Sequence, residues 1–206
     1  MFGLYTNKMK RIEKLLSELP IISTMVNEDQ VRFILEQLES VKVEGDVVEL
    51  GSNIGTTSIF LQTYLNGAKK LHCYDSFEGF PEKDVKDEGA QYHFEFKKGG
   101  CSVPLEEFRY TFTSRNIPLP EIHKGWFKDQ EYPEKISFAF LDSDFYTSIK
   151  DSLEKVYPRL VKGGKIVLHD YDWDVLPGVK IACDEFFKDK KEKVEFHNYL
   201  GLVKKM

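Results

Sequence analysis

One stretch of the sequence decides the fold: Val47-Val48-Glu49-Leu50-Gly51-Ser52-Asn53-Ile54-Gly55-Thr56-Thr57-Ser58. Its apolar first part predicts a short buried strand over residues 47–50. Gly51 and Gly55 bracket a tight turn, and Thr56 begins a run of hydroxyl residues that can cap a following helix. A strand, a glycine-rich turn and a helix in this order present backbone N–H groups and a helix N-terminus to a ligand.

The acidic residue before the turn indicates the kind of ligand. The Glu49 carboxylate would repel a pyrophosphate, whereas it suits a cofactor with a cationic amino group and a sulfonium. Asn53 also stands where the dinucleotide fingerprint requires its second glycine. The stretch therefore favours S-adenosylmethionine (SAM) over NAD, and an NAD-dependent oxidoreductase is the nearest alternative.

The composition limits the classes of protein to which this chain can belong. The chain has 206 residues, of which 41% are hydrophobic and 31% charged, and this fits one globular domain. The net charge is −5 and no basic run is unbroken, so we expect neither nucleic acid nor a membrane as a partner. We see no signal peptide and no apolar run long enough for a bilayer, so we expect a cytoplasmic protein. Three cysteines without metal-ligand spacing argue against a disulfide framework.

Strands and helices alternate along the chain. Periodic apolar residues predict two N-terminal helices, one ended by Pro20 and one that begins at Asn27. Later strands are predicted over residues 70–75, 119–124, 136–141, 165–168, 194–196 and 199–203. We expect Gly163-Gly164 to turn the chain into the fifth strand, and His197-Asn198 to separate the last two. The alternation predicts a Rossmann-like, doubly wound α/β fold, a mainly parallel seven-stranded sheet with helices on both faces.

One segment breaks this rhythm. Residues 77–104 are polar, aromatic and far longer than the ~2–6 residues that usually link a strand to its helix. We expect a mobile lid over the site of the acceptor, the substrate that would react with SAM, and we expect its hinge at Lys97-Lys98-Gly99-Gly100. Four aromatic residues would face the acceptor: Phe80, Tyr92, Phe94 and Phe96. The expected organisation is one domain over residues 1–206, with N-terminal helices over 1–44 and this lid over 77–104.

Acidic residues follow three of the predicted strands. Asp75 ends the second strand, where its carboxylate can accept hydrogen bonds from both ribose hydroxyls or, alternatively, can stabilise a turn. Asp142 follows the fourth strand, and His169-Asp170 follows the fifth. Because neighbouring parallel strands lie ~4.8 Å apart, these side chains can converge on a Mg²⁺ or Mn²⁺ ion. The alternative is that they cap the next helices, and His169 is open as a ligand, a base or a supporting group.

Together these motifs resemble the macrocin O-methyltransferase family of class I SAM-dependent methyltransferases. The resemblance runs from about residue 45 to 188 of the sequence. The matching stretches are Val48-Glu49-Leu50-Gly51, Tyr74-Asp75-Ser76-Phe77-Glu78-Gly79-Phe80-Pro81, Lys124-Gly125-Trp126-Phe127, Leu141-Asp142-Ser143-Asp144-Phe145-Tyr146-Thr147-Ser148 and His169-Asp170-Tyr171. The resemblance implies transfer of the SAM methyl group to a hydroxyl of a small molecule, a sugar or natural-product glycoside, with help from a divalent metal.

The motifs and the resemblance name the site residues. Residues expected to bind the cofactor are Glu49, Gly51, Ser52, Asn53, Gly55, Thr56, Asp75, Ser76, Gly125, Trp126 and Asp142. The family's metal ligands match Asp142, His169 and Asp170, although position 169 is usually an aspartate in the family. Asp144 matches the position of the base, and His169 is the other candidate. A SAM-binding protein without turnover is the alternative from another class, and a homo-oligomer is left open.

Overall fold

A mixed sheet forms the centre of the molecule. The computed structural model describes residues 2–89 and 96–206. The strands are β1 (Asp46–Leu50), β2 (Leu71–Asp75), β3 (Glu121–Lys124), β4 (Ile136–Leu141), β5 (Leu160–Leu168), β6 (Glu195–His197) and β7 (Leu200–Lys204). Their order in the seven-stranded sheet is β3-β2-β1-β4-β5-β7-β6. The first five run parallel, whereas β7 is antiparallel to β5 and β6 to β7. The predicted fold class is confirmed.

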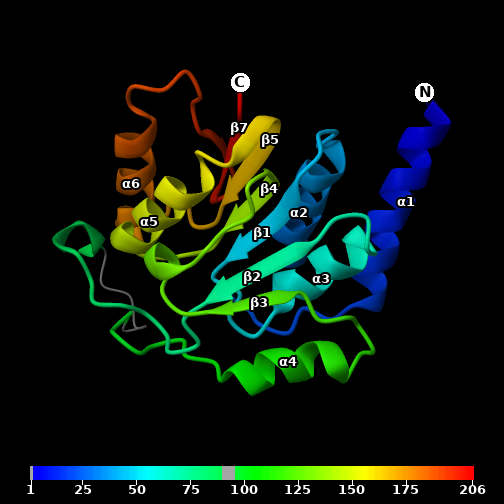
Figure 1. Cartoon of the computed structure of the whole chain (residues 1–206), viewed down its shortest axis with the longest axis horizontal. Helices are drawn as coiled ribbons and strands as arrows, with labels where there is room; N and C mark the ends of the chain where they lie inside the picture. The colour runs from blue at the N-terminus through cyan, green and yellow to red at the C-terminus, as the bar shows by residue number, and fades with distance from the viewer. Residues whose placement is uncertain (1, 90–95) are drawn as a thin grey trace.

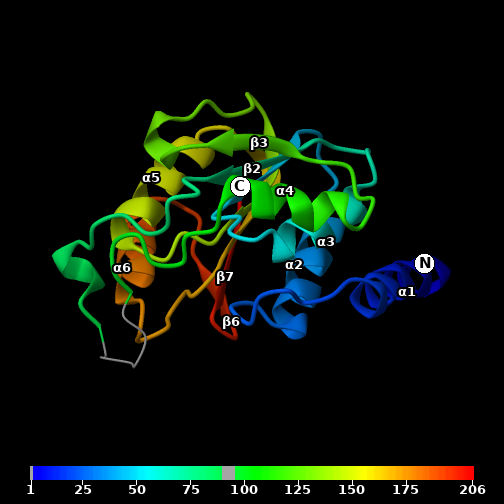
Figure 2. The same ribbon diagram turned by 90° about the horizontal axis from the view of Figure 1, so that it is seen from below.

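Helices cover both faces of this sheet (Figures 1 and 2). The α-helices are α1 (Phe2–Glu18), α2 (Glu28–Ser40), α3 (Thr56–Leu65), α4 (Leu105–Thr113), α5 (Tyr146–Val156) and α6 (Pro177–Phe187). Two short 3₁₀ helices are η1 (Val85–Asp87) and η2 (Phe127–Asp129). Helices α1, α2 and α3 pack on one face, and α5 and α6 on the other (Figure 1). The capping box of α2 joins Asn27 and Gln30, as the sequence predicts.

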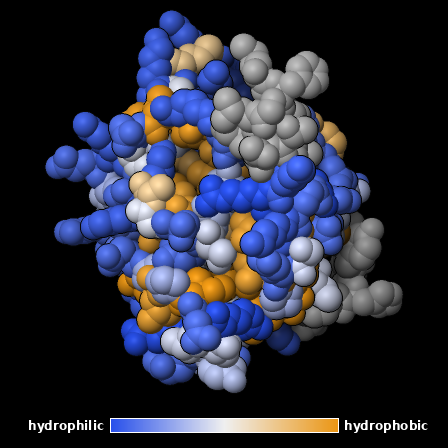
Figure 3. Space-filling view, turned by 90° about the vertical axis from the view of Figure 1, so that its right-hand side faces the viewer, coloured by the Kyte–Doolittle hydropathy of each residue, from blue (hydrophilic) through white to orange (hydrophobic). Residues whose placement is uncertain are grey.

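Each face of the sheet has its own apolar core. In β1, Val47 packs with residues of α2 and α3, whereas its neighbour Val48 packs with residues of α5 and α6. This follows from the alternation of side chains along a strand. All six residues of β4 are buried, as expected for a central parallel strand. On the side of the molecule that carries α1 and α2, hydrophilic side chains project outward and apolar groups lie between them (Figure 3).

Two predictions about local structure were wrong, and one helix was not predicted. Strand β5 begins at Leu160, so Gly163-Gly164 lies within the strand, where a register shift against β4 accommodates the extra residues. The last two strands are joined at Asn198-Tyr199, both with left-handed backbone (φ 46° and 63°), and His197 belongs to β6. Helix α4 was not predicted, because it lacks a side-chain cap and only Phe108, Thr111 and Phe112 are buried.

No described helix is both long and apolar enough to cross a membrane. Cys73, Cys101 and Cys183 are free thiols.

Candidate active site at the carboxyl edge of the sheet

The principal cavity lies where the sheet changes its winding direction. The chain runs from β1 outward to β2 and β3, and then returns to β4 on the other side of β1. Ligands of doubly wound sheets bind outside the strand ends at such a point. The cavity there measures about 410 Å³. It brings together these residues of the predicted site: Gly51, Asn53, Asp75, Ser76, Gly125, Trp126, Asp142, Asp144, His169 and Asp170.

The turn after β1 needs glycine at its first position. Gly51 has φ 91°, and a Cβ atom there would lie 1.7 Å from the carbonyl oxygen of Asp142. Any side chain would therefore separate the ends of β1 and β4. The close approach places the turn directly beside the acidic residues that follow β4.

Asp75 connects the turn with the segment after β2. Its Oδ2 accepts a hydrogen bond from the backbone N–H of Asn53 (2.8 Å), and its Oδ1 accepts one from Phe77 N–H (2.7 Å). Burial raises the pKa of Asp75, and these two N–H donors partly oppose that rise. The turn-stabilising role is thus present, and Asp75 also lines the cavity.

Four residues predicted to bind the cofactor are not among the described residues that line the cavity. Glu49 is buried beneath the turn, where it accepts hydrogen bonds from Ser58 Oγ and from Cys73 Sγ. Burial raises the pKa of Glu49 to about 8. The other three support the turn and α3: Ser52, Gly55 and Thr56. These four residues lie in or next to the turn after β1 and do not line the cavity.

Asp142, His169 and Asp170 form a compact donor cluster. Nδ1 of His169 lies 3.1 Å from Asp142 Oδ1 and 3.0 Å from Asp170 Oδ2. One donor atom from each residue lies within 4.8 Å of the others. Burial alone would lower the pKa of His169, but the two carboxylates hold it well above its usual value. Two carboxylate oxygens and one imidazole nitrogen suit a divalent cation.

Asp144 lies beside this cluster, just before α5. Its backbone is left-handed (φ 59°), a conformation that costs energy outside glycine and often marks a functional position. Desolvation, together with the charges of Asp142 and Asp170, raises its pKa well above the ordinary aspartate value. Such a carboxyl group holds a proton more strongly than an ordinary aspartate does.

The rim of the cavity includes residues that the sequence did not identify. Thr24 and Met25 come from the loop before α2, and Tyr199 comes from the β6–β7 turn. The rings of Trp173 and Tyr199 meet edge to face with centroids 6.5 Å apart. No local motif marks these residues, because only the packing of distant segments brings them to the sheet edge.

The described parts of the 77–104 segment supply another part of the rim. Phe80, Pro81, Phe96 and Cys101 line the cavity. Two backbone hydrogen bonds hold its ends together, from Phe80 N–H to Gly100 O (3.0 Å) and from Gly99 N–H to Phe80 O (2.9 Å). Tyr92 and Phe94 lie outside the described residues.

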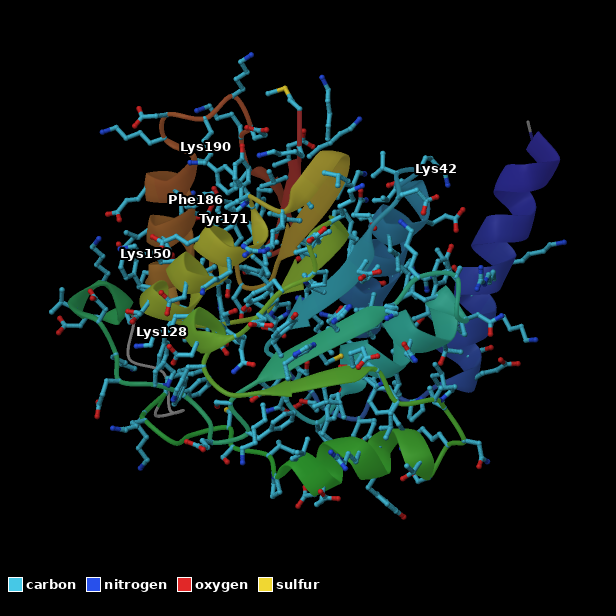
Figure 4. The ribbon with its side chains drawn as sticks, in the orientation of Figure 1. Lys42, Lys128, Lys150, Tyr171, Phe186 and Lys190 are labelled. Atoms are coloured by element: carbon cyan, nitrogen blue, oxygen red, sulfur yellow. The ribbon has the colours of Figure 1, made fainter. Side chains whose placement is uncertain are left out.

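Helix α6 also fixes the chain just beyond the acidic cluster. Tyr171 donates a hydrogen bond from its hydroxyl to Asp184 Oδ1 (3.2 Å), and its ring lies on the α6 side of the molecule (Figure 4). Lys180 lies over the same ring, 4.8 Å from its centroid. These contacts hold Tyr171, the residue that follows Asp170. They therefore constrain the position of the Asp170 carboxylate.

Comparison with known proteins identifies the family. The model of the macrocin O-methyltransferase (TylF) family matches residues 17–198. The chain belongs to this family. The family resemblance expected from the sequence is therefore confirmed, and the matched region contains Asp142, His169 and Asp170.

Curated relatives of this TylF-family chain are natural-product O-methyltransferases. The 8-demethyl-8-(2,3-dimethoxy-alpha-L-rhamnosyl)-tetracenomycin-C 4'-O-methyltransferase of Streptomyces olivaceus is 31% identical over 157 residues, 71% of this chain and 60% of the relative. The demethyldecarbamoylnovobiocin O-methyltransferase of Streptomyces niveus is 28% identical over 171 residues, 77% of this chain and 64% of the relative. The chain thus spans less than two thirds of the length of these relatives.

Solved structures show the same fold. The O-methyltransferase NovP superposes with a TM-score of 0.75 at 24% identity, covering 89% of this chain and 82% of NovP. A calicheamicin methyltransferase superposes with a TM-score of 0.68 at 18% identity, covering 97% of this chain and 91% of that protein. The fold of these methyltransferases therefore extends over nearly the whole chain.

Proposed function

We propose that this chain transfers the methyl group of SAM to a hydroxyl of a small glycosylated acceptor, with help from a divalent cation. One observation carries the proposal. A single cavity contains the turn after β1 and the carboxylate of Asp75 at the end of β2. The same cavity contains the Asp142-His169-Asp170 cluster after β4 and β5. The name of one relative contains a rhamnosyl group, which supports a glycoside as the acceptor.

The first half of the cavity would hold the cofactor. Gly51 and Asn53 offer backbone groups, Asp75 offers carboxylate oxygens, and Trp126 offers an aromatic face that is 38% exposed. SAM, when bound, supplies a methyl group that a sulfonium already activates. The residues of the chain then need to position the acceptor oxygen and remove its proton.

The second half would prepare the acceptor. Asp142, His169 and Asp170 fit a divalent cation, because their donor atoms converge and neither nitrogen of His169 has a hydrogen-bond partner among the described residues. A cation held there would supply a Lewis acid that lowers the pKa of the acceptor hydroxyl. Asp144 would receive the proton, since its raised pKa makes it a better base than an ordinary aspartate. His169 would be less suited to that role, because it would be occupied as a ligand of the cation.

Residues 77–104 would cover the acceptor. Support comes from Phe80 and Phe96, which line the cavity, and from the turn at residues 97–100, where Gly100 N–H donates to Lys97 O (2.8 Å). Because the segment starts directly after Asp75, its position would respond to cofactor binding.

Calorimetry and methyl transfer test the proposal in two steps. The chain should bind SAM and S-adenosylhomocysteine. It should then transfer labelled methyl from SAM to at least one member of a panel of deoxysugar-bearing aromatic polyketides and macrolides. Asp144→Asn should keep S-adenosylhomocysteine binding and lose transfer. Absence of cofactor binding would overturn the proposal, whereas binding without transfer to any acceptor would favour a SAM-binding protein without turnover.

A further inference from the structure

His169 is the unusual member of the donor cluster. It is 4% exposed and sits between two carboxylates, at the end of a strand that is buried beside β4. Its Nδ1 is close to both carboxylates, yet neither contact has the alignment of a hydrogen bond, and Nε2 also has no partner among the described residues. Buried imidazoles normally satisfy at least one nitrogen. The nitrogens of His169 therefore have no hydrogen-bond partner among the described residues, and they are free to bind a cation together with the two carboxylates.

The spacing of the donor atoms indicates what kind of ligand this is. Adjacent donors on an octahedral ion, with bonds of about 2.1 Å, lie about 3.0 Å apart. The distances from His169 Nδ1 to the nearest oxygens of Asp142 and Asp170 are 3.1 and 3.0 Å. The ring of His169 is held by an edge contact with Phe140, with ring centroids 6.1 Å apart, on the central strand β4. The nitrogen donor is therefore held near the two carboxylates by the core of the sheet.

Divalent ions differ in their preference for nitrogen and oxygen donor atoms. Mg²⁺ is a hard ion that prefers oxygen ligands and keeps several waters, whereas imidazole nitrogen suits first-row transition metals. Replacing one oxygen donor by imidazole therefore penalises Mg²⁺ more than a transition-metal ion of similar size and charge.

We propose that His169 makes this site selective for a first-row transition-metal dication over Mg²⁺. The proposal rests on the metal site of the proposed function and specifies its ion. Asp142 and Asp170 would supply oxygen donors, which bind both Mg²⁺ and transition-metal ions. The His169 imidazole would supply the preference for the transition-metal ion.

Metal titration of the wild type and two variants tests this selectivity. Chain prepared without a polyhistidine tag is titrated with Co²⁺, Mn²⁺ and Mg²⁺ by calorimetry. In the wild type the dissociation constant for Mg²⁺ should exceed that for Co²⁺, and this ratio should fall roughly tenfold or more in His169→Asp and His169→Asn. The ratio is the informative quantity, because it cancels the general change in affinity that a new charge causes. The asparagine variant offers an oxygen donor without adding charge. An unchanged ratio in both variants would overturn the proposal.

Spectroscopy of the wild type gives a second measurement that needs no variant to fold. Pulsed electron paramagnetic resonance of chain loaded with one equivalent of Mn²⁺ should show coupling to an imidazole ¹⁴N nucleus. The coupling should disappear in His169→Asn and persist in His72→Gln, a matched control. His72 is half-buried and, like His169, lies near a carboxylate, that of Asp46, but it is outside the cluster. Bound Mn²⁺ without nitrogen coupling would overturn the proposal.

The outcomes separate this proposal from the proposed function. If the wild type binds S-adenosylhomocysteine and binds Mg²⁺ as tightly as Co²⁺, methyl transfer with a metal stands and the selectivity is overturned. If the wild type binds S-adenosylhomocysteine but no dication, the metal is overturned together with its selectivity, and SAM binding stands alone.

Discussion

The backbone N–H of Asn53 donates a hydrogen bond to Oδ2 of Asp75 over 2.8 Å. The side chain of Asn53 extends the connection, because its Nδ2 donates to the carbonyl oxygen of Cys101 over 2.9 Å. Asn53 has left-handed backbone with φ 46°, which asparagine tolerates better than most residues. One residue thus joins the turn after β1, the carboxylate after β2 and the C-terminal end of the 77–104 segment.

Removing this carboxylate should weaken cofactor binding. Asp75→Ala should raise the dissociation constant for S-adenosylhomocysteine by the equivalent of ~1.5–3 kcal/mol, because charge-assisted hydrogen bonds are lost. Calorimetry measures the change. Asp46→Ala is a suitable control, since Asp46 lies at the opposite end of β1 and contacts His72. Equal affinity in Asp75→Ala and wild type would contradict the assignment of a ribose-binding role.

The metal should be needed for transfer and not for cofactor binding. EDTA should abolish methyl transfer, and added divalent cation should restore it. Asp170→Asn should weaken metal binding, because it removes a charged donor from the cluster, and should leave S-adenosylhomocysteine binding within about twofold of wild type. Transfer at the full rate in EDTA would instead indicate a metal-free reaction with Asp144 or His169 as the base.

Glu49 should make stability depend on pH. Its pKa is about 8 in the folded chain against 4.5 in the unfolded chain. Between these values the folded chain holds a proton that the unfolded chain has released, so stability falls as pH rises through this window. The loss should be on the order of 1 kcal/mol per pH unit between pH 6 and 7 and should level off above pH 8.

Urea unfolding of Glu49→Gln measures this contribution. Glutamine mimics the protonated side chain, so the variant should lose less stability than wild type between pH 6 and 9. All other titrating groups are shared, and the difference between the two proteins therefore isolates Glu49. Parallel pH profiles for the two proteins would show that Glu49 titrates at its ordinary value.

Gly178→Ala should destabilise the chain, although alanine normally stabilises a helix. A Cβ at Gly178 would lie 1.8 Å from Asp87 Oδ1 and 2.8 Å from Tyr146 N. Asp87 Oδ1 also accepts a hydrogen bond from Tyr146 N–H (2.7 Å), so the Asp87 carboxylate fits between the starts of α5 and α6. We expect a loss of more than about 2 kcal/mol in the free energy of unfolding.

A double-mutant cycle checks the cause. The smaller side chain in Asp87→Ser should relieve the clash, so Gly178→Ala should cost clearly less in the Asp87→Ser background. Additive effects of the two substitutions would place the origin of the destabilisation elsewhere.

Limited proteolysis addresses the expected lid. Cleavage near Gly99-Gly100 should be slower in the presence of S-adenosylhomocysteine and an acceptor together than in the free chain. Ligands that occupy the cavity would contact Phe80 and Cys101 on both sides of this turn. Equal cleavage rates in the two conditions, with full activity after deletion of residues 84–100, would contradict a covering role.

The sequence by itself determined the sheet and the place of the site. Apolar runs such as residues 136–141 mark buried strands, because a strand needs only a few neighbouring residues to define its faces. The acids Asp75, Asp142 and Asp170 follow directly after such runs, so the parallel arrangement alone brings them to one edge. The prediction of a turn at Gly163-Gly164 from the local sequence was wrong, because pairing with β4 overrides the turn preference of two glycines.

Only the tertiary structure decided which of these side chains meet the cavity. Glu49 and Asp75 both come from strand ends beside the turn, yet Glu49 is buried against Ser58 and Asp75 lines the cavity. Thr24 and Tyr199 reach the same rim from opposite ends of the chain, and no pattern in either segment predicts this. His169 differs from a surface histidine because the packing of β5 against β4 holds its ring between two carboxylates. Such contacts depend on long-range packing, which a local pattern of residues does not encode.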